Sequence, residues 1–237
     1  MGPSGGAAAQ GSGRVWRAAR RRALLAYRAG LADRVDGVLA RGDDPGFTAA
    51  WERVSPVLTW DHKASARRLW ELARLPLQGE IVEIGSYLGN STVYLALAGG
   101  HVHAVDPHTE ESMLQVPGST RTSDQFQENL RTFGVADRVT YHRATSVDAA
   151  RDWSGGPVRL LFIDGLHTYD DVRADYAAWR PHLAPDHVVL FDDDLWVEVE
   201  TAVDDLRREE RPAVFRRRGG QAMFSTVPLP LRTAGLP

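Results

Sequence analysis

The stretch IVEIGSYLGNS, residues 81–91, predicts a strand, a glycine turn and the start of a helix. Three of its first four residues form the apolar run of a strand that is buried on both faces: Ile81, Val82 and Ile84. Gly85 and Gly89 let the backbone turn sharply against a ligand, because glycine has no Cβ. We expect Asn90 or Ser91 to cap the helix that follows.

The spacing of the two glycines argues against a pyrophosphate ligand. A dinucleotide-binding turn follows the pattern Gly-x-Gly-x-x-Gly, which brings backbone amides up to the phosphates. This chain instead has Glu83-x-Gly85-x-x-x-Gly89, with an acid two residues before the first glycine. Since a carboxylate would repel a phosphate, a cationic ligand fits the turn better.

A second acid follows the next predicted strand, His101–Val105. Asp106 ends this strand and lies 23 positions after Glu83. An acid about 20 residues past the glycine turn is where nucleoside-binding folds hydrogen-bond the ribose hydroxyls. Taken alone, Asp106 is equally compatible with a turn before Pro107. Its combination with Glu83 and the two glycines favours the ribose role.

These residues resemble motif I and the second-strand acid of the class I S-adenosylmethionine-dependent methyltransferases, whose cofactor carries an ammonium and a sulfonium. The resemblance implies a cofactor site. From their positions, Ser146 is expected at the adenine, and Thr59 and Tyr87 at the methionine end. The cofactor-binding residues expected in total are Thr59, Glu83, Gly85, Ser86, Tyr87, Gly89, Asp106, Ser146 and Asp164.

Length and composition predict one globular catalytic domain. The chain has 237 residues, of which 43% are hydrophobic and 25% charged, with a net charge of −3. The charge balance argues against a nucleic-acid-binding protein, and no apolar run approaches the roughly 20 residues of a membrane-spanning helix. The absence of cysteine excludes disulfides and thiolate metal sites, and it is compatible with a cytoplasmic location.

Beyond the second strand, predicted strands and helices alternate, which indicates a parallel sheet with right-handed crossovers. Further strands are expected at residues 139–142, 160–163 and 188–191, and a terminal hairpin at 214–217 and 222–227. Further helices are expected at residues 15–39, 63–75, 123–133 and 197–208, and between His167 and Pro181. We therefore predict an α/β doubly wound, Rossmann-like methyltransferase fold with a mostly parallel seven-stranded sheet and a C-terminal antiparallel hairpin.

The predicted domain organisation has three parts. Residues 1–13 are expected to be a disordered tail, residues 14–75 an N-terminal helical segment, and residues 76–237 the methyltransferase domain. The long connection at residues 107–121 is predicted to be a lid that closes over the acceptor together with Trp60.

Four more functional candidates follow the fourth and fifth strands: Asp164, His167, Asp192 and Asp193. The carboxyl ends of neighbouring parallel strands meet at one sheet edge, so the aspartates can offer several oxygens to one Mg²⁺ ion. A histidine side chain, with an ordinary pKa of about 6.5, can take a proton from a bound hydroxyl. Helix caps and turns would explain the aspartates equally, and a backbone hydrogen bond the histidine. Four other histidines show no spacing typical of ligands: His62, His101, His103 and His108.

This second group resembles the metal-dependent O-methyltransferases of natural-product tailoring, which include macrolide-sugar methyltransferases and a cephalosporin hydroxylase-like relative. The resemblance spans roughly residues 59–194. It implies that Asp164, Asp192 and Asp193 hold Mg²⁺ and that His167 is the base. Three aspartates follow one another here, at residues 192–194, so the register of ligation stays open, and a helix cap is the other role for Asp194.

The expected activity is O-methylation of a hydroxyl, most naturally on a sugar, in a secondary metabolite such as an antibiotic. A catechol-like diol is an alternative acceptor, and a homo-oligomer is the expected assembly. Two other functions remain open. One is a metal-independent N- or O-methyltransferase, and the other is a non-catalytic partner of a tailoring oxygenase that keeps the nucleoside-binding fold.

Overall fold

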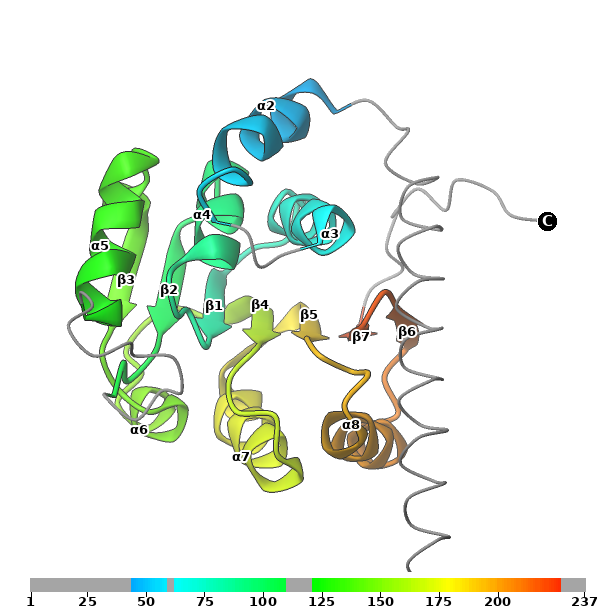
Figure 1. Cartoon of the computed structure of the whole chain (residues 1–237). Coiled ribbons are helices and arrows are strands. Elements are labelled where there is room, and N and C mark those ends of the chain that lie inside the picture. Colours follow the sequence, from blue (N-terminus) through cyan, green and yellow to red (C-terminus); the bar gives the residue numbers. More distant parts are fainter. Residues whose placement is uncertain (1–43, 59–61, 110–120, 227–237) are drawn as a thin grey trace, which may run out of the picture.

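A computed structural model describes residues 44–58, 62–109 and 121–226 of the chain (Figure 1). One seven-stranded sheet runs through it in the order β3-β2-β1-β4-β5-β7-β6. The strands are β1 (Glu80–Ile84), β2 (Val102–Val105), β3 (Val139–His142), β4 (Val158–Ile163), β5 (Leu183–Phe191), β6 (Val214–Arg218) and β7 (Gln221–Ser225). The first five are parallel, and β7 pairs antiparallel with β5 and β6. The predicted fold class is confirmed.

Helices cover both faces of the sheet (Figure 1). One face carries α2 (Pro45–Val54), α3 (Lys63–Ala73), α4 (Asn90–Leu97) and α5 (Thr122–Thr132), whose apolar side chains share one core cluster. The other carries α6 (Ser146–Arg151), α7 (Tyr169–Trp179) and α8 (Val197–Glu210), which build the second cluster. Short 3₁₀ turns precede β3 at Ala136–Arg138 and β5 at Arg180–His182. The sheet thus lies between two layers of helices, as in a doubly wound fold.

The central strands are apolar throughout because both of their faces are covered. In β1, Ile81 belongs to the cluster on one face, and Val82 and Ile84 to the cluster on the other. Every residue of β4 is buried. These strands pair in parallel, so the carboxyl ends of β1, β2, β4 and β5 lie at one edge of the sheet. The loops at this edge carry the polar residues of the predicted site.

Two helices that the sequence analysis did not predict are present. The first is α2, which begins at Pro45. There Asp44 accepts a hydrogen bond from the backbone N–H of Phe47 at 3.0 Å, and Pro45 takes the first helical position. The second helix, α6, begins beside Thr145, whose hydroxyl oxygen accepts from the N–H of Asp148.

Two predicted helix caps are wrong. The N-cap of α4 is Gly89, in a left-handed conformation with φ of +87°, so Asn90 and Ser91 lie inside the helix and do not cap it. The N-cap of α8 is Trp196 rather than Asp194. α8 nevertheless begins at Val197, where the sequence analysis placed its start.

Several predictions lie outside the described residues: the tail at residues 1–13, the helix at 15–39, Thr59, Trp60 and most of the lid at 107–121. Within the described ranges, α2 and α3 pack into the same core as the sheet. No helix in these ranges combines the length and the apolar character that a membrane span needs.

Candidate functional site

The glycine turn after β1 is shaped by contacts within the protein. Gly85 has a φ of +87°, and a Cβ at this position would overlap the carbonyl group of Asp164 at the end of β4. Gly89 also has a φ of +87°, and a Cβ there would lie 3.0 Å from the ring of Phe126 on α5. Both glycines are therefore required by backbone conformation and packing. The turn joins the end of β1 to the ends of β4 and α5.

Glu83 is fully buried directly below this turn. Burial raises the pKa of its carboxyl from 4.5 to about 7, although hydroxyls at Ser91, Thr92 and Ser86 partly offset the shift. The hydroxyl of Thr92 donates a hydrogen bond to it. A carboxylate held in such an environment gains most from a cationic ligand, because a positive charge would offset the cost of desolvation.

Asp106 lies at the end of β2, beside the turn. One carboxylate oxygen accepts a hydrogen bond from the backbone N–H of Tyr87 at 2.8 Å, and the other accepts from the N–H of His108 at 2.7 Å. The side chain keeps 15% exposure. Each oxygen has a second lone pair, so Asp106 can still accept hydrogen bonds from the hydroxyls of a ribose.

The structure gives Ser146 a role within the protein. Its hydroxyl oxygen accepts a hydrogen bond from the indole N–H of Trp179 at 3.1 Å. The hydroxyl also lowers the pKa of the neighbouring Asp175, which burial raises to about 6. A contact of Ser146 with adenine therefore stays a prediction, and its hydroxyl is already hydrogen-bonded on one side.

Three of the predicted catalytic side chains come together at the ends of β4 and β5. Among the described residues, one group could hold a metal ion, and it consists of Asp164, His167 and Asp193, whose ligand atoms lie within 4.8 Å of one another. The imidazole Nε2 of His167 is 3.5 Å from Asp164 Oδ1 and 3.3 Å from Asp193 Oδ2. All three side chains are partly exposed. We call these three residues the acidic group; it contains one imidazole.

The three consecutive aspartates differ in their contacts. Asp192 uses one carboxylate oxygen to accept a hydrogen bond from the backbone N–H of Asp193, which has a φ of +51°. The carboxylate of Asp192 is not a member of the three-residue group. Asp194 is buried and forms an ion pair with Arg217 of β6. This pair ties the loop after β5 to the edge hairpin.

Two exposed apolar side chains lie near His167 in the sequence or in space. Leu166 is 69% exposed and Trp196 58% exposed, although both are large and hydrophobic. The rings of Trp196 and His167 lie 5.7 Å apart, centre to centre. Apolar side chains next to a few converging polar groups are typical of a binding site for a small organic molecule.

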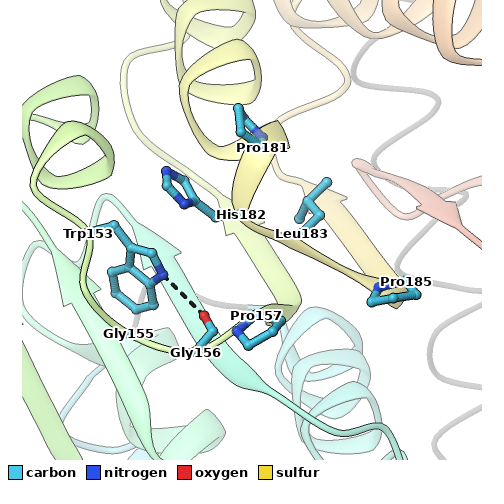
Figure 2. Close-up of a pocket in the computed structure, with 8 residues that line it drawn as sticks. All are labelled: Trp153, Gly155, Gly156, Pro157, Pro181, His182, Leu183 and Pro185. Carbon is cyan, nitrogen blue, oxygen red and sulfur yellow. Dashed lines mark hydrogen bonds between the residues drawn. The ribbon is translucent and has the colours of Figure 1, made fainter.

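A hollow of about 300 Å³ lies at the opposite edge of the sheet (Figure 2). It is bordered by the ring of Trp153, by His182 and by three prolines, near the amino ends of β4 and β5. The indole N–H of Trp153 donates to the carbonyl of Gly156 at 3.1 Å within the same loop. The hollow lies away from the acidic group and shares no residue with it.

The sequence analysis missed one residue beside the turn. His108 was set aside for lack of ligand spacing, yet it is buried, with 4% exposure, and contacts both Tyr87 and Tyr141. Its position two residues after Asp106 is the only sequence signal that could have indicated this.

A comparison with protein families identifies a known domain in this chain. Residues 82–193 match a family model described as a methyltransferase domain. The matched range contains the glycine turn, Asp106 and the group of Asp164, His167 and Asp193.

Two relatives of known sequence are similar to this chain. One is the uncharacterized protein y4gI of Sinorhizobium fredii, 47% identical over 152 residues, which cover 61% of this chain and 15% of the relative. The other is catechol O-methyltransferase of Mycobacterium tuberculosis, 27% identical over 157 residues, which cover 65% of this chain and 66% of the relative. The chain therefore spans less than two thirds of the length of either relative.

Two solved structures share the fold. The O-methyltransferase TomG of Streptomyces achromogenes, involved in tomaymycin synthesis and solved with S-adenosylmethionine, is 20% identical with a TM-score of 0.56, covering 84% of this chain and 98% of TomG. CalS11, a TDP-rhamnose 3′-O-methyltransferase of calicheamicin biosynthesis, is 20% identical with a TM-score of 0.54, covering 82% of this chain and 92% of CalS11.

Proposed function

The chain carries a methyltransferase domain of the S-adenosylmethionine-dependent class, and from this premise we propose that it methylates a hydroxyl oxygen of a small-molecule secondary metabolite. The observation that carries the proposal is the meeting of two groups at one sheet edge. The glycine turn, with Glu83 and Asp106, lies at the ends of β1 and β2. The acidic group of Asp164, His167 and Asp193 lies at the ends of β4 and β5.

The first group fits the methyl donor. In the proposed complex, Asp106 accepts the ribose hydroxyls, and the buried Glu83 favours the positively charged methionine end through the turn. The backbone of the turn, from Gly85 to Gly89, approaches the ligand closely. TomG, which shares the fold, was solved with S-adenosylmethionine bound.

The second group fits a divalent cation and an acceptor hydroxyl. Two carboxylates within 4.8 Å of each other suit Mg²⁺, which prefers a few carboxylate oxygens together with water. Asp164 and Asp193 would hold the ion, with Asp192 next to them. When bound, Mg²⁺ supplies Lewis acidity that favours the deprotonated form of a nearby hydroxyl.

His167 is the proposed general base. Its imidazole Nε2 lies between the carboxylates of Asp164 and Asp193, which favour the protonated imidazolium that forms when it takes the proton. The deprotonated oxygen then attacks the sulfonium methyl in line, and S-adenosylhomocysteine leaves. Alignment of the two bound molecules supplies the rest of the rate enhancement.

The apolar side chains beside the acidic group support the proposed class of acceptor. Leu166 and Trp196 offer an apolar surface for the face of a ring, and the carboxylates require an oxygen beside it. A sugar hydroxyl of a natural product fits both requirements, and CalS11 methylates a sugar nucleotide. A catechol fits them as well, with two adjacent oxygens, and the mycobacterial relative is named for that acceptor.

Calorimetry with S-adenosylhomocysteine tests the cofactor half of the proposal. We expect micromolar binding to the wild type and a loss of at least about tenfold in Asp106→Ala, because about 1.4 kcal/mol is a factor of ten and two bonds to the ribose would be lost. Asp152→Ala is the matched control, since the Asp152 side chain is exposed and accepts its hydrogen bonds from Arg151. Absence of binding to the wild type, with and without Mg²⁺, would refute the proposal.

Turnover with a panel of glycosides and catechols tests the metal half. We expect EDTA to abolish methyl transfer and Mg²⁺ to restore it, whereas a metal-independent methyltransferase would keep its activity in EDTA. His167→Gln should lower kcat by about 100- to 10,000-fold while the affinity for S-adenosylhomocysteine stays that of the wild type. His187→Gln, in the middle of β5, is the control.

A further inference from the structure

We propose that His108 is a positioning residue that holds the peptide of Tyr87, and with it the glycine turn, in the conformation that receives the methyl donor. The inference rests on the proposed role of the turn in binding S-adenosylmethionine. None of the comparisons gives a function to His108 or to its partner Tyr141.

The hydrogen bonds of His108 define its protonation. Its Nε2 lies 2.7 Å from the carbonyl oxygen of Tyr87, and its Nδ1 lies 2.7 Å from the hydroxyl oxygen of Tyr141. A carbonyl oxygen only accepts, so Nε2 carries the proton and donates it. Nδ1 is then the acceptor for the Tyr141 hydroxyl. Burial raises the pKa of Tyr141 to about 12, so this hydroxyl keeps its proton at neutral pH.

Asp106 holds the other side of the Tyr87 residue. Its carboxylate accepts the backbone N–H of Tyr87 at 2.8 Å and, through the other oxygen, the backbone N–H of His108 at 2.7 Å. Both polar groups of the Tyr87 backbone are thus bound by two residues that follow β2. The proposed ribose ligand and the histidine belong to one network.

The turn needs such support because its backbone is strained. Tyr87 has a φ of +42° and His108 a φ of +43°, the left-handed region that residues with side chains rarely adopt. Such conformations persist only where surrounding contacts hold them. A third anchor comes from α5, where the amide of Asn129 donates to the carbonyl of Leu88 at 2.8 Å.

His108 is also fixed by packing. Its ring lies edge-on to Tyr141 at 5.3 Å and 5.5 Å from the ring of Phe126, centre to centre. Phe126 is the residue that a Cβ on Gly89 would contact at 3.0 Å. The histidine therefore fills the space between β2, β3, α5 and the turn, and it cannot rotate away from the Tyr87 carbonyl without a change in that packing.

A preformed turn binds its ligand more tightly, because the ordering cost is met during folding. Without His108, the Tyr87 carbonyl would lose its partner, and the strained peptide could relax. Removing the partner of this partly buried carbonyl costs roughly 1.4–2.8 kcal/mol, which corresponds to about a 10- to 100-fold loss of cofactor affinity if the bound state restores the original turn.

Three variants and one control test this. His108→Ala should weaken S-adenosylhomocysteine binding by about 10- to 100-fold, and Tyr141→Phe by about fivefold, the equivalent of one net hydrogen bond. His108→Gln should recover part of the affinity, since its amide can donate to the same carbonyl. His187→Ala, on a histidine remote from the turn, should bind as the wild type does. Mn²⁺ binding should be equal in all four, which separates a local effect from general damage.

Two readouts do not depend on the ligand. ¹⁵N NMR of the imidazole should show the proton of His108 on Nε2. Hydrogen exchange at the Tyr87 amide should be slow in the wild type and at least about tenfold faster in His108→Ala, because loss of about 1.4 kcal/mol of local stability gives that factor. Tyr141→Phe keeps the imidazole and serves if His108→Ala does not fold.

The outcomes separate the two proposals. If the wild type binds S-adenosylhomocysteine and the His108 variants bind it equally well, the positioning role is refuted and the proposed function stands. If the wild type does not bind it, the proposed function fails, and the tautomer and the exchange rates alone decide whether His108 holds the turn. A His108 imidazole with its proton on Nδ1 and none on Nε2 could not donate to the Tyr87 carbonyl, and it would refute the positioning role in either case.

Discussion

At the scale of single residues, the site depends on groups whose local sequence does not reveal their surroundings. Glu83 lies in an apolar strand, and only the packing of α4 against β1 shows that its carboxyl is fully buried next to Thr92. Asp193 and Asp194 are neighbours of the same residue type, but their contacts differ. Asp193 lies beside His167 in the acidic group, and Asp194 is paired with Arg217. Residue identity defines the available chemistry, and the contacts decide which residue uses it.

Glu83→Gln should stabilise the protein without ligand and weaken its cofactor binding. Burial raises the pKa of Glu83 from 4.5 to about 7. Between these values the unfolded chain releases a proton that the folded protein retains, so the stability contributed by this group falls as the pH rises from about 4.5 to about 7. Above that range the cost is on the order of 3 kcal/mol, and glutamine removes it.

Urea unfolding at pH 5 and pH 8 measures this effect. The variant should gain stability over the wild type at pH 8 and little at pH 5, and Glu52→Gln, at an exposed position, should gain at neither. Equal stability of wild type and Glu83→Gln at pH 8 would show that Glu83 is not held in an unfavourable environment.

At the scale of elements, the site is built where turns pack against one another. The glycine turn after β1 lies against the end of β4, so that Gly85 faces the backbone of Asp164 and Gly165. The sequence analysis placed the glycines correctly but explained them by a ligand. Their strictest requirement is this backbone contact, which couples the proposed donor side of the site to the proposed acceptor side.

Gly85→Ala should destabilise the fold by about 3 kcal/mol or more, since it combines a positive φ with overlap of a new Cβ and the Asp164 carbonyl. Gly99→Ala is the matched control. Gly99 also has a positive φ, of +104°, but a Cβ there would meet no atom within 4 Å, so only the conformational cost of about 1–2 kcal/mol remains. Chemical unfolding of both variants measures the difference. Equal losses would mean that the contact with β4 is unimportant.

The edge strand β3 and its neighbour β2 carry a pair of histidines that should make stability depend on pH. His103 of β2 and His142 of β3 share a hydrogen bond of 3.0 Å between their rings. Burial lowers the pKa of both side chains, and a contact with Glu80 only partly offsets this for His103. The unfolded chain therefore takes up protons first as the pH falls through about 6.5, and stability declines below that value.

The double variant His103→Gln with His142→Gln should flatten this decline between pH 7 and pH 5. His187→Gln should leave the wild-type slope unchanged. The midpoint of urea unfolding at half-unit pH intervals gives the slopes, and an unaltered slope in the double variant would assign the acid sensitivity to other groups.

At the scale of the whole molecule, the sheet joins two half-sites that are far apart in the sequence. The order β3-β2-β1-β4-β5 puts β1 between β2 and β4, so Asp106 and Asp164 flank the same turn from opposite sides. α2 and α3 pack on the same core as the sheet. A ligand that spans both half-sites should therefore stabilise the whole fold.

S-adenosylhomocysteine at about 100 times its Kd should stabilise the folded protein by about 2.7 kcal/mol, provided that it does not bind the unfolded chain. For a chain of this length, that corresponds to a rise in Tm of roughly 5–10 °C. Thermal unfolding with and without the ligand measures the shift. Asp106→Ala should show a smaller shift at the same ligand concentration, and an equal shift would place the ligand elsewhere.

The sequence by itself determined the fold class, the positions of the parallel strands and the turn after β1, because buried strands and glycine turns are written in local patterns of apolar residues and glycine. Strand β3 was predicted at its observed bounds, and the two strands of the hairpin after β5 were predicted within two residues of theirs. The tertiary structure alone decided that His108 holds Tyr87, that Asp193 lies beside His167, and that Asp194 pairs with Arg217. These pairings join residues from different elements, and the orientation of a side chain at the end of a strand depends on backbone angles and neighbours that no local pattern records.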